Sequence, residues 1–408
     1  MSTNVWRGDA PAVAQVNTVT PANVGIGNTF TVTCNGKSIT VQATAATVAN
    51  VTALLAAAIA ATTIAEFLEV TAADITTAVT LTANTPGVPF TQTSSASGGT
   101  ATNTTATTTA NNGPNDWSIA ANWSTGVAPV NSDDVYISGP SSILYGLAQS
   151  AVTLTSLNIL GDFTGTIGLP LVSESGGYYE YRANRLAIGT STLNIGKGAG
   201  SGSGRIRLSL GAVTTAINVY TTGAAIDAYG SIDIKGHASN TYTCNLFKGS
   251  VAFATEPSDV ALLVINQGYQ DNQAGDVTLY LGVGVTLTTM VQSGGDVRMF
   301  GVATTYTMIG GTAWIVGTGT ITTLTIDAGT FIDQSSGTIT TLKVGKDGDY
   351  DRSEDQRSKT ITNSTLEAGA AFLDPNKTVT FTNAMALNRC KLSEVTLDLG
   401  SHFNIQRS

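Results

Sequence analysis

The sequence predicts a mostly β protein in which a C-terminal parallel β-solenoid follows a small α+β domain. Three observations predict this fold class. A strand-type segment recurs about every 18 residues in the lower half of the chain, and a helix-type pattern lies near the N-terminus. Charged residues make up 12% of the 408 residues, about half of the ~25% usual in globular domains. Thr, Ser, Asn and 44 Gly provide most of the polarity instead.

The N-terminal part begins with an arm, residues 1–12, and continues as a docking domain, residues 13–93. Asn35 and Gly36 separate two alternating runs, which is the strongest short signal for a β-hairpin. Thr47 is placed to cap a helix over residues 48–61, whose apolar side chains share one face. Strands are expected at residues 12–20, 29–33, 38–41, 67–71, 79–83 and 88–91.

Two connecting segments follow. Residues 94–114 are almost entirely Ser, Thr, Ala, Gly and Asn, which favours a flexible or extended linker. Residues 115–137 contain Trp117 and Trp123 among Gly and Pro, and we expect them to cap the solenoid. A solenoid must cover its terminal rung or expose its apolar interior and unpaired strand edges. A carbohydrate-binding aromatic platform is the alternative interpretation of the two Trp.

The solenoid is expected to extend from this cap to residue 408. Its first rungs are irregular, and we expect functional loops among them. Short strand-type segments lie at residues 154–159, 186–189, 193–196, 206–210, 217–220, 232–234, 261–266 and 277–281.

A clear internal repeat occupies the lower half. GTITTLTI at residues 319–326 recurs as GTITTLKV at residues 337–344, an offset of 18. A short fixed period of strand-type sequence indicates stacked rungs, with side chains such as Ile321 facing inward. We assign the four extra residues of one step to a polar loop at residues 346–355. Related segments start at residues 284, 301, 359 and 377, so the successive steps from 284 are 17, 18, 18, 22 and 18 residues.

Two segments carry a resemblance to known proteins. Trp117, residues 122–126, Pro129 and residues 133–135 resemble the entry segment of β-helical surface proteins from bacteria and their phages. Residues 179–206, together with the hairpin domain, resemble uncharacterised structural proteins of tailed phages and prophages. The similarity spans most of residues 1–220. It implies a non-enzymatic virion role, on the head or on the tail, and brings no catalytic residues with it.

Charge and hydropathy exclude two classes of partner. The net charge is −9 and no stripe of Lys or Arg is present, so we expect no nucleic-acid partner. The most apolar stretch, residues 48–61, is shorter than the ~20 residues of a membrane span, so we expect no membrane partner. No signal peptide follows Met1. A surface-type protein without an export signal fits a virion assembled in the host cytoplasm and released by lysis.

The sequence offers little catalytic chemistry, and we expect no catalytic, cofactor-binding or metal-binding residues. His237 and His402 are far apart, and the three Cys suggest buried thiols. Two carboxylate pairs, Asp227 with Asp233 and Asp327 with Asp333, could serve a polysaccharide depolymerase, but we expect no aromatic sugar cleft around Asp327 and Asp333. A calcium site is the alternative to a solvated loop for four aspartates: Asp347, Asp349, Asp351 and Asp355.

These observations together favour a non-enzymatic structural protein of a phage virion. The most specific expectation is a capsid decoration protein on the head surface, because the chain ends soon after its last rungs without a receptor-binding tip. Its partners would be the major capsid protein or another virion protein, and two further copies of itself in a homotrimer. A tail fibre or tailspike, with or without depolymerase activity, and a bacterial surface adhesin are the alternatives.

Overall fold

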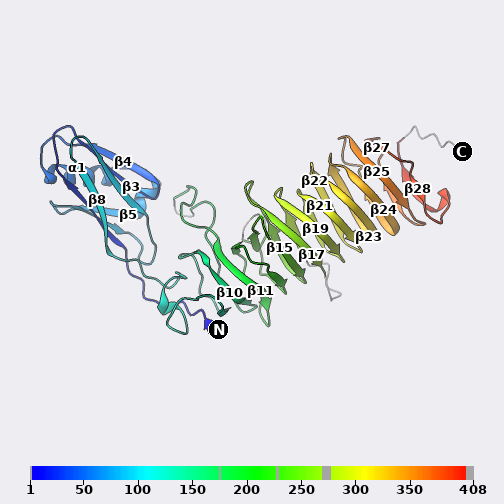
Figure 1. Cartoon of the computed structure of the whole chain (residues 1–408), viewed down its shortest axis with the longest axis horizontal. Helices are drawn as coiled ribbons and strands as arrows, with labels where there is room; N and C mark the ends of the chain where they lie inside the picture. Colours follow the sequence, from blue (N-terminus) through cyan, green and yellow to red (C-terminus); the bar gives the residue numbers. More distant parts are fainter. Residues whose placement is uncertain (1, 174–175, 227, 229, 269–276, 401–408) are drawn as a thin grey trace.

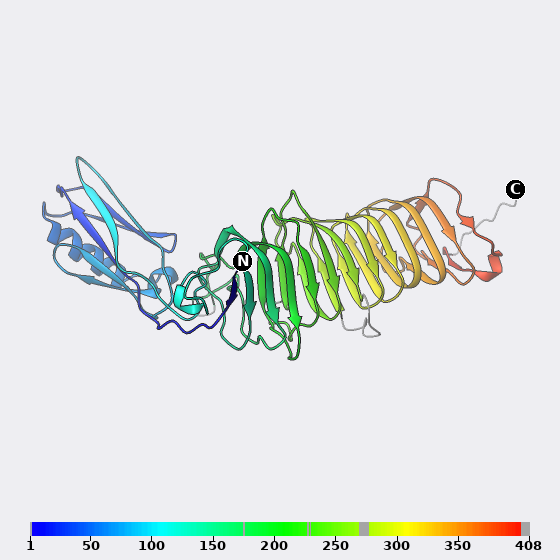
Figure 2. The same cartoon turned by 60° about the horizontal axis from the view of Figure 1, so that its bottom comes forward.

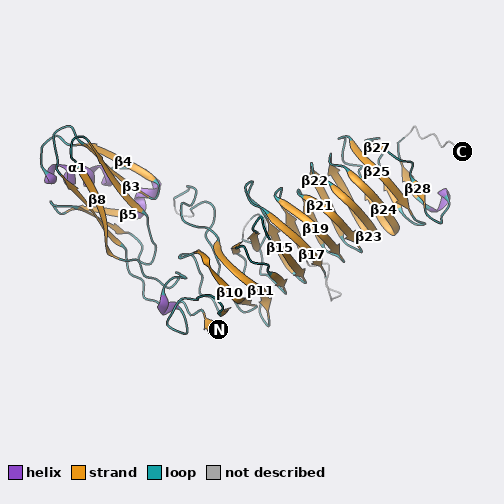
Figure 3. Ribbon diagram, viewed as in Figure 1, coloured by secondary structure: helices purple, strands orange, loops and turns teal. Residues whose placement is uncertain are grey.

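The computed structural model describes residues 2–173, 176–226, 228, 230–268 and 277–400. A small α+β domain lies at one end of an elongated molecule, and a parallel β-solenoid extends away from it (Figures 1 and 2). Strands dominate the chain, and helix is almost confined to the small domain (Figure 3). The predicted fold class is therefore confirmed.

The helix and hairpin of the small domain lie where the sequence predicts them. α1 (Val48–Ala60) starts after Thr47, whose side chain accepts a hydrogen bond from the Asn50 backbone N–H. β3 (Thr29–Cys34) and β4 (Lys37–Gln42) form the hairpin. Asn35 and Gly36 both have positive φ, 54° and 82°, as its tight turn requires. The apolar side of α1 is buried with the two sheets in one core.

The expected linker is wrong over most of its length. β7 (Gln92–Ser97) pairs with β3, and β8 (Thr102–Thr109) pairs with β2 (Val16–Ala22). β-branched Thr suits a half-buried strand. The open edge of β2 supplies backbone partners for β8, and the open edge of β3 supplies them for β7. Ser/Thr-rich composition therefore does not indicate a flexible segment here, because these residues complete the domain.

Two sheets result, with the orders β5-β6-β2-β8 and β4-β3-β7. β6 (Val79–Ala83) matches the predicted strand. A 3-10 helix, η1 (Ala65–Glu69), replaces the start of the strand expected at residues 67–71, and β5 (Val70–Asp74) follows it. Residues 88–91 form no strand.

The solenoid is built from parallel strands on successive rungs. Between the cap and the C-terminal rungs, every second strand along the chain pairs, so each rung contributes to two faces. Its strands are β9 (Asp134–Ile137), β10 (Ala148–Leu160), β11 (Leu186–Lys197), β12 (Ile206–Leu210), β13 (Ala216–Val219), β14 (Ile232–Lys235), β15 (Thr241–Leu246), β16 (Gly249–Phe253), β17 (Ala261–Gln267), β18 (Val277–Leu281), β19 (Val285–Gln292), β20 (Asp296–Met299), β21 (Val302–Met308), β22 (Thr312–Gly317), β23 (Ile321–Ser335), β24 (Ile339–Asp351), β25 (Lys359–Leu366), β26 (Ala371–Leu373), β27 (Val379–Phe381), β28 (Ala386–Leu387) and β29 (Thr396–Asp398). Two short 3-10 helices, η2 (Ala120–Asn122) and η4 (Leu392–Glu394), lie near its ends.

The repeat sets the register of the lower rungs. Ala303 pairs with Ile321, Ile321 with Ile339, and Ile339 with Ile361. All four side chains are buried, as alternation of inward aliphatic and outward Thr residues requires. The predicted stacking of these segments is confirmed.

Two expected offsets at the ends of the repeat are wrong. Leu287 pairs with Ala303, an offset of 16, where the sequence alignment gives 17. Ile361 pairs with Phe381, an offset of 20, where the alignment gives 18. In both places the inward aliphatic or aromatic side chain fixes the strand register. The Thr residues that dominate the alignment face outward, so they do not determine which residues pair.

The polar loop expected at residues 346–355 is only partly a loop. β24 continues through Asp351, so residues 347–351 form a rung. One of the four extra residues lies at the bend after Val344, because the offset there changes from 18 to 19. The other three lie in the turn between Asp351 and Ile361, where the offset reaches 22.

The N-terminal arm is part of the cap. β1 (Thr3–Val5) pairs in parallel with β9 and forms the first strand of the solenoid. The Trp123 ring packs edge-on between Trp6 and Trp117, with centroids 5.0 and 4.7 Å away. All three indoles are buried. Trp117 and Trp123 belong to the core of the solenoid, so the carbohydrate platform is wrong, since a sugar cannot reach these rings.

Ladders of similar side chains on successive rungs add cohesion along the rod. In one column of five Asn side chains, each of the last four donates from Nδ2 to the Asn Oδ1 of the preceding rung, at 2.8–3.0 Å. The column consists of Asn158, Asn194, Asn218, Asn245 and Asn266. A second column, inside the lower rungs, stacks Phe331, Tyr350 and Phe372.

None of the helices in the described part of the chain has the length and hydropathy of a membrane span.

Candidate functional site

The junction between the small domain and the solenoid is centred on Glu69, the last residue of η1. Its carboxylate accepts hydrogen bonds from Tyr178 (2.5 Å), Tyr181 (2.8 Å) and Arg182 (3.1 Å), which belong to the solenoid. Asn35 donates to the same carboxylate from within the small domain, at 3.1 Å. Four donors from two domains thus converge on one side chain.

Arg182 joins the two domains by several contacts. Its Nε and NH2 groups donate to the two oxygens of Glu180, at 2.6 and 3.0 Å. NH1 donates to the Pro89 carbonyl of the small domain, and the guanidinium lies 4.7 Å from the centre of the Tyr181 ring. Burial alone would lower the pKa of Arg182, but the bonded carboxylates outweigh it and raise that pKa. The side chain is therefore a fixed cation.

The tyrosines of the junction are held as hydrogen-bond donors. Burial, followed by the bond to Glu69, raises the pKa of Tyr178. Burial is also the largest cause of the raised pKa of Tyr181. The Arg182 cation lowers that pKa, and the nearby Glu69 carboxylate raises it further. Both hydroxyls therefore keep their protons at neutral pH and donate them in hydrogen bonds to Glu69.

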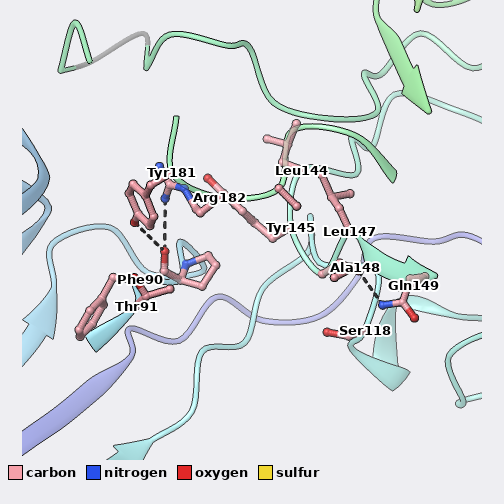
Figure 4. Close-up of a pocket in the computed structure, with 13 residues that line it drawn as sticks. Phe90, Thr91, Ser118, Leu144, Tyr145, Leu147, Ala148, Gln149, Tyr181 and Arg182 are labelled. Carbon is pink, nitrogen blue, oxygen red and sulfur yellow. Dashed lines mark hydrogen bonds between the residues drawn. The ribbon is translucent and has the colours of Figure 1, made fainter. Parts of the chain in front are cut away.

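A cavity of about 440 Å³ lies beside this cluster. Phe90 and Thr91 of the small domain form one side, and Leu144, Tyr145 and Leu147 of the solenoid form the other (Figure 4). Arg182 and Tyr181 both donate hydrogen bonds to the Pro89 carbonyl of the small domain (Figure 4). The recess combines apolar walls with few polar groups, which is the composition of a binding pocket.

Asp327 and Asp333, considered from the sequence as a carboxylate pair, do not form an open site. Asp333 is completely buried and contacts Lys359 and Arg352, at 2.8 and 3.1 Å. Asp327 lies on the surface, 3.9 Å from Lys343. Because one carboxylate of the pair is inside the rod, the two cannot flank a polysaccharide.

The described member of the other pair is buried as well. Asp233 is buried against Arg185, at 2.8 Å, and Arg185 also contacts Asp259 at 2.7 Å. Asp227 lies outside the described residues. This second ion cluster ties neighbouring rungs together near the junction.

The remaining candidates have ordinary surroundings. His237 is exposed, and His402 lies outside the described residues. Burial, followed by Glu69 and Glu66, raises the pKa of the Cys34 thiol to about 12. The three cysteines are free thiols.

The aspartates considered for calcium are dispersed. Asp347, Asp349 and Asp351 alternate along β24, and Asp355 contacts Arg352 and Arg357, at 3.1 and 2.9 Å. Within the described ranges, no group of three or more His, Cys, Asp or Glu side chains is arranged to hold a metal ion. Asp347, Asp349 and Asp351 share one face of β24 but are about 7 Å apart along the strand. Arginines already satisfy Asp355.

Sequence reasoning missed the junction. The run YYEYR at residues 178–182 concentrates aromatic and charged residues in a chain with 7% aromatic and 12% charged residues. That concentration was a usable signal for an interface. Glu69 gave no comparable signal, because its partners lie more than 100 positions away.

Comparisons of the chain with family models, with curated proteins and with solved structures found no match.

Proposed function

We propose that this protein is a non-enzymatic structural component of a tailed-phage virion, in which the small domain docks and the solenoid projects. The observation that carries the proposal is the construction of one continuous rod. β1 enters the first rung of the solenoid, and Glu69 fastens the small domain to the loop that holds Tyr178 and Arg182. A rod that transmits force to a particle surface needs such a joint, because a mobile tether would decouple the docked domain from the rod.

The buried ion clusters support a structural role. Asp233 and Asp333, which a depolymerase would need at the surface, are each bound by buried cations inside the rod. Breaking such a pair leaves an uncompensated buried charge, so these residues stabilise the stack of rungs.

The head surface is the narrower part of the proposal, with the major capsid protein or another virion protein as partner. A tail fibre or tailspike would use the same rod, so the experiment has to separate heads from tails. An antibody against the recombinant chain would be applied to density-purified particles and to separated heads and tails. Detection on intact heads is the expected result. Detection only on tails would move the protein there, and detection only in cell envelopes would refute the virion role in favour of an adhesin.

Two further parts of the proposal have direct assays. Sedimentation equilibrium of the purified chain is expected to give three times the monomer mass of 41.7 kDa, and a monomer would refute the homotrimer. Incubation with capsular polysaccharide is expected to release no reducing ends. Release that persists in a preparation free of other phage proteins would show an enzyme instead.

A further inference from the structure

A groove on the outer face of the solenoid lies far along the rod from the domain junction. It has a volume of about 340 Å³. It spans strands β18, β20, β22 and β23, which pair in parallel on one face. Its lining residues are Thr278, Asp296, Val297, Arg298, Trp314 and Gln334.

The register places the functional side chains of this groove on neighbouring rungs. Arg298 pairs with Trp314, and Asp296 pairs with Thr312 next to it. Buried Val297 and Met299 alternate with Asp296 and Arg298, so the two charged side chains face outward together. Trp314 likewise stands outward between the buried Ala313 and Ile315. Adjacent rungs are about 4.8 Å apart, which brings the indole and the two charged groups within the span of one small ring.

Trp314 differs from the other three tryptophans of the chain. Trp6, Trp117 and Trp123 are buried in the cap, whereas Trp314 is half-buried on an open face. Neighbouring groups hold the site in shape: Arg298 lies 5.8 Å from the centre of the Phe300 ring, and Gln334 donates to Glu354 at 3.0 Å. Trp314 thus lines the groove together with a carboxylate, a guanidinium and an amide.

We infer that this groove is a saccharide-binding site, in which one pyranose ring packs its C–H face on Trp314. The negative face of an indole attracts polarised C–H groups, and sugar hydroxyls need both acceptors and donors around that face. Asp296 supplies acceptors, and Arg298 supplies donors in a planar fork. A flat apolar partner would leave both charges unpaired, so an amphipathic ring with hydroxyls fits better. The glycan is bound without cleavage, and the inference does not depend on the virion role.

The test is binding to an array of bacterial surface polysaccharides, with the full chain and three variants. Trp314→Ala and Asp296→Asn are expected to lose binding by about tenfold or more, which corresponds to one good contact. Tyr220→Ala is the matched control, because Tyr220 is another half-buried aromatic residue, stacked on Phe247 outside the groove. It is expected to bind as the wild type does.

A second readout keeps the test independent of folding. A bound polysaccharide is expected to protect the one half-exposed indole from acrylamide quenching, while the three buried indoles contribute little change. Absence of binding to every polysaccharide on the array would overturn the inference. Wild-type binding by folded Trp314→Ala, or binding without protection from quenching, would overturn it as well.

Discussion

Lys359 Nζ lies 2.8 Å from Asp333 Oδ2, and both side chains are fully buried between neighbouring rungs. The same carboxylate accepts a hydrogen bond from Tyr350 at 2.6 Å and lies 3.1 Å from Arg352. Burial lowers the pKa of Lys359, and Asp333 opposes that effect. Burial, followed by Asp333, raises the pKa of Tyr350. One acidic side chain thus satisfies three groups from two later rungs.

Removing that charge should weaken the solenoid strongly. Asp333→Asn leaves Lys359 and Arg352 buried with less compensating charge, and we expect a loss of about 3–5 kcal/mol in the free energy of unfolding. Asp327→Asn on the same strand is the matched control, because Asp327 is about half exposed and should cost at most about 1 kcal/mol. Denaturant unfolding of both variants measures the difference. Equal effects would show that the buried cluster does not stabilise the rod.

The asparagine column should contribute measurably to rung cohesion. Asn245→Ala removes the bond to Asn218 and leaves Asn266 without its acceptor, so we expect a loss of about 1–3 kcal/mol. Thr243→Ala, an exposed outward position on the same strand, should change stability by about 0.5 kcal/mol or less. Thermal and denaturant unfolding report both. If the two variants were equally stable, the asparagine column would not contribute to the stability of the rod.

Arg182 should control how firmly the small domain is held. Arg182→Ala leaves Glu69 and Glu180 close together without their shared cation, so the junction should open while the solenoid keeps its own stability. Small-angle scattering is expected to show a wider distribution of molecular dimensions, and protease should cut the junction faster. Lys37→Ala is the control, since Lys37 is largely exposed and 4.0 Å from Glu66. A variant Arg182→Ala with unchanged dimensions would contradict the proposed joint.

Acid should release the N-terminal strand. Burial raises the pKa of Asp133, but hydrogen bonds from Ser2 and from the Val130 N–H outweigh it and lower that pKa. The carboxylate therefore stabilises the fold at pH values above its unfolded value of about 3.8, and this stabilisation is lost as the pH falls through the lower folded value. We expect wild type to lose more stability than Asp133→Asn between about pH 4 and pH 2. If the stability of wild type and of Asp133→Asn fell in parallel with pH, Asp133 would not hold the N-terminal strand in place.

Sequence patterns predicted the solenoid because its repeat is carried by inward aliphatic residues. Ile321, Ile339 and Ile361 recur in similar octapeptides, and buried positions determine parallel register. The asparagine column has no fixed period in the sequence, because its members are separated by 36, 24, 27 and 21 residues. Loops of different length between the rungs remove any fixed period there.

The parts that could not be predicted depend on contacts between distant segments. β1 looks like a tail in the sequence, yet β9 supplies its backbone partners more than 100 positions later. Residues 94–109 look like a linker, and only the free edges of β2 and β3 make them strands. The junction depends likewise on Glu69 meeting Arg182. Local composition carries none of this information.

The most direct test of the proposed virion role is cryo-electron microscopy of particles purified from lysates of the cells that produce this chain. We expect copies of a rod with the cross-section of the solenoid on the particle, with the small domain at its surface and the rungs of β25–β29 farthest away. A particle without such a rod, or a rod attached through its C-terminal rungs, would contradict the proposed role.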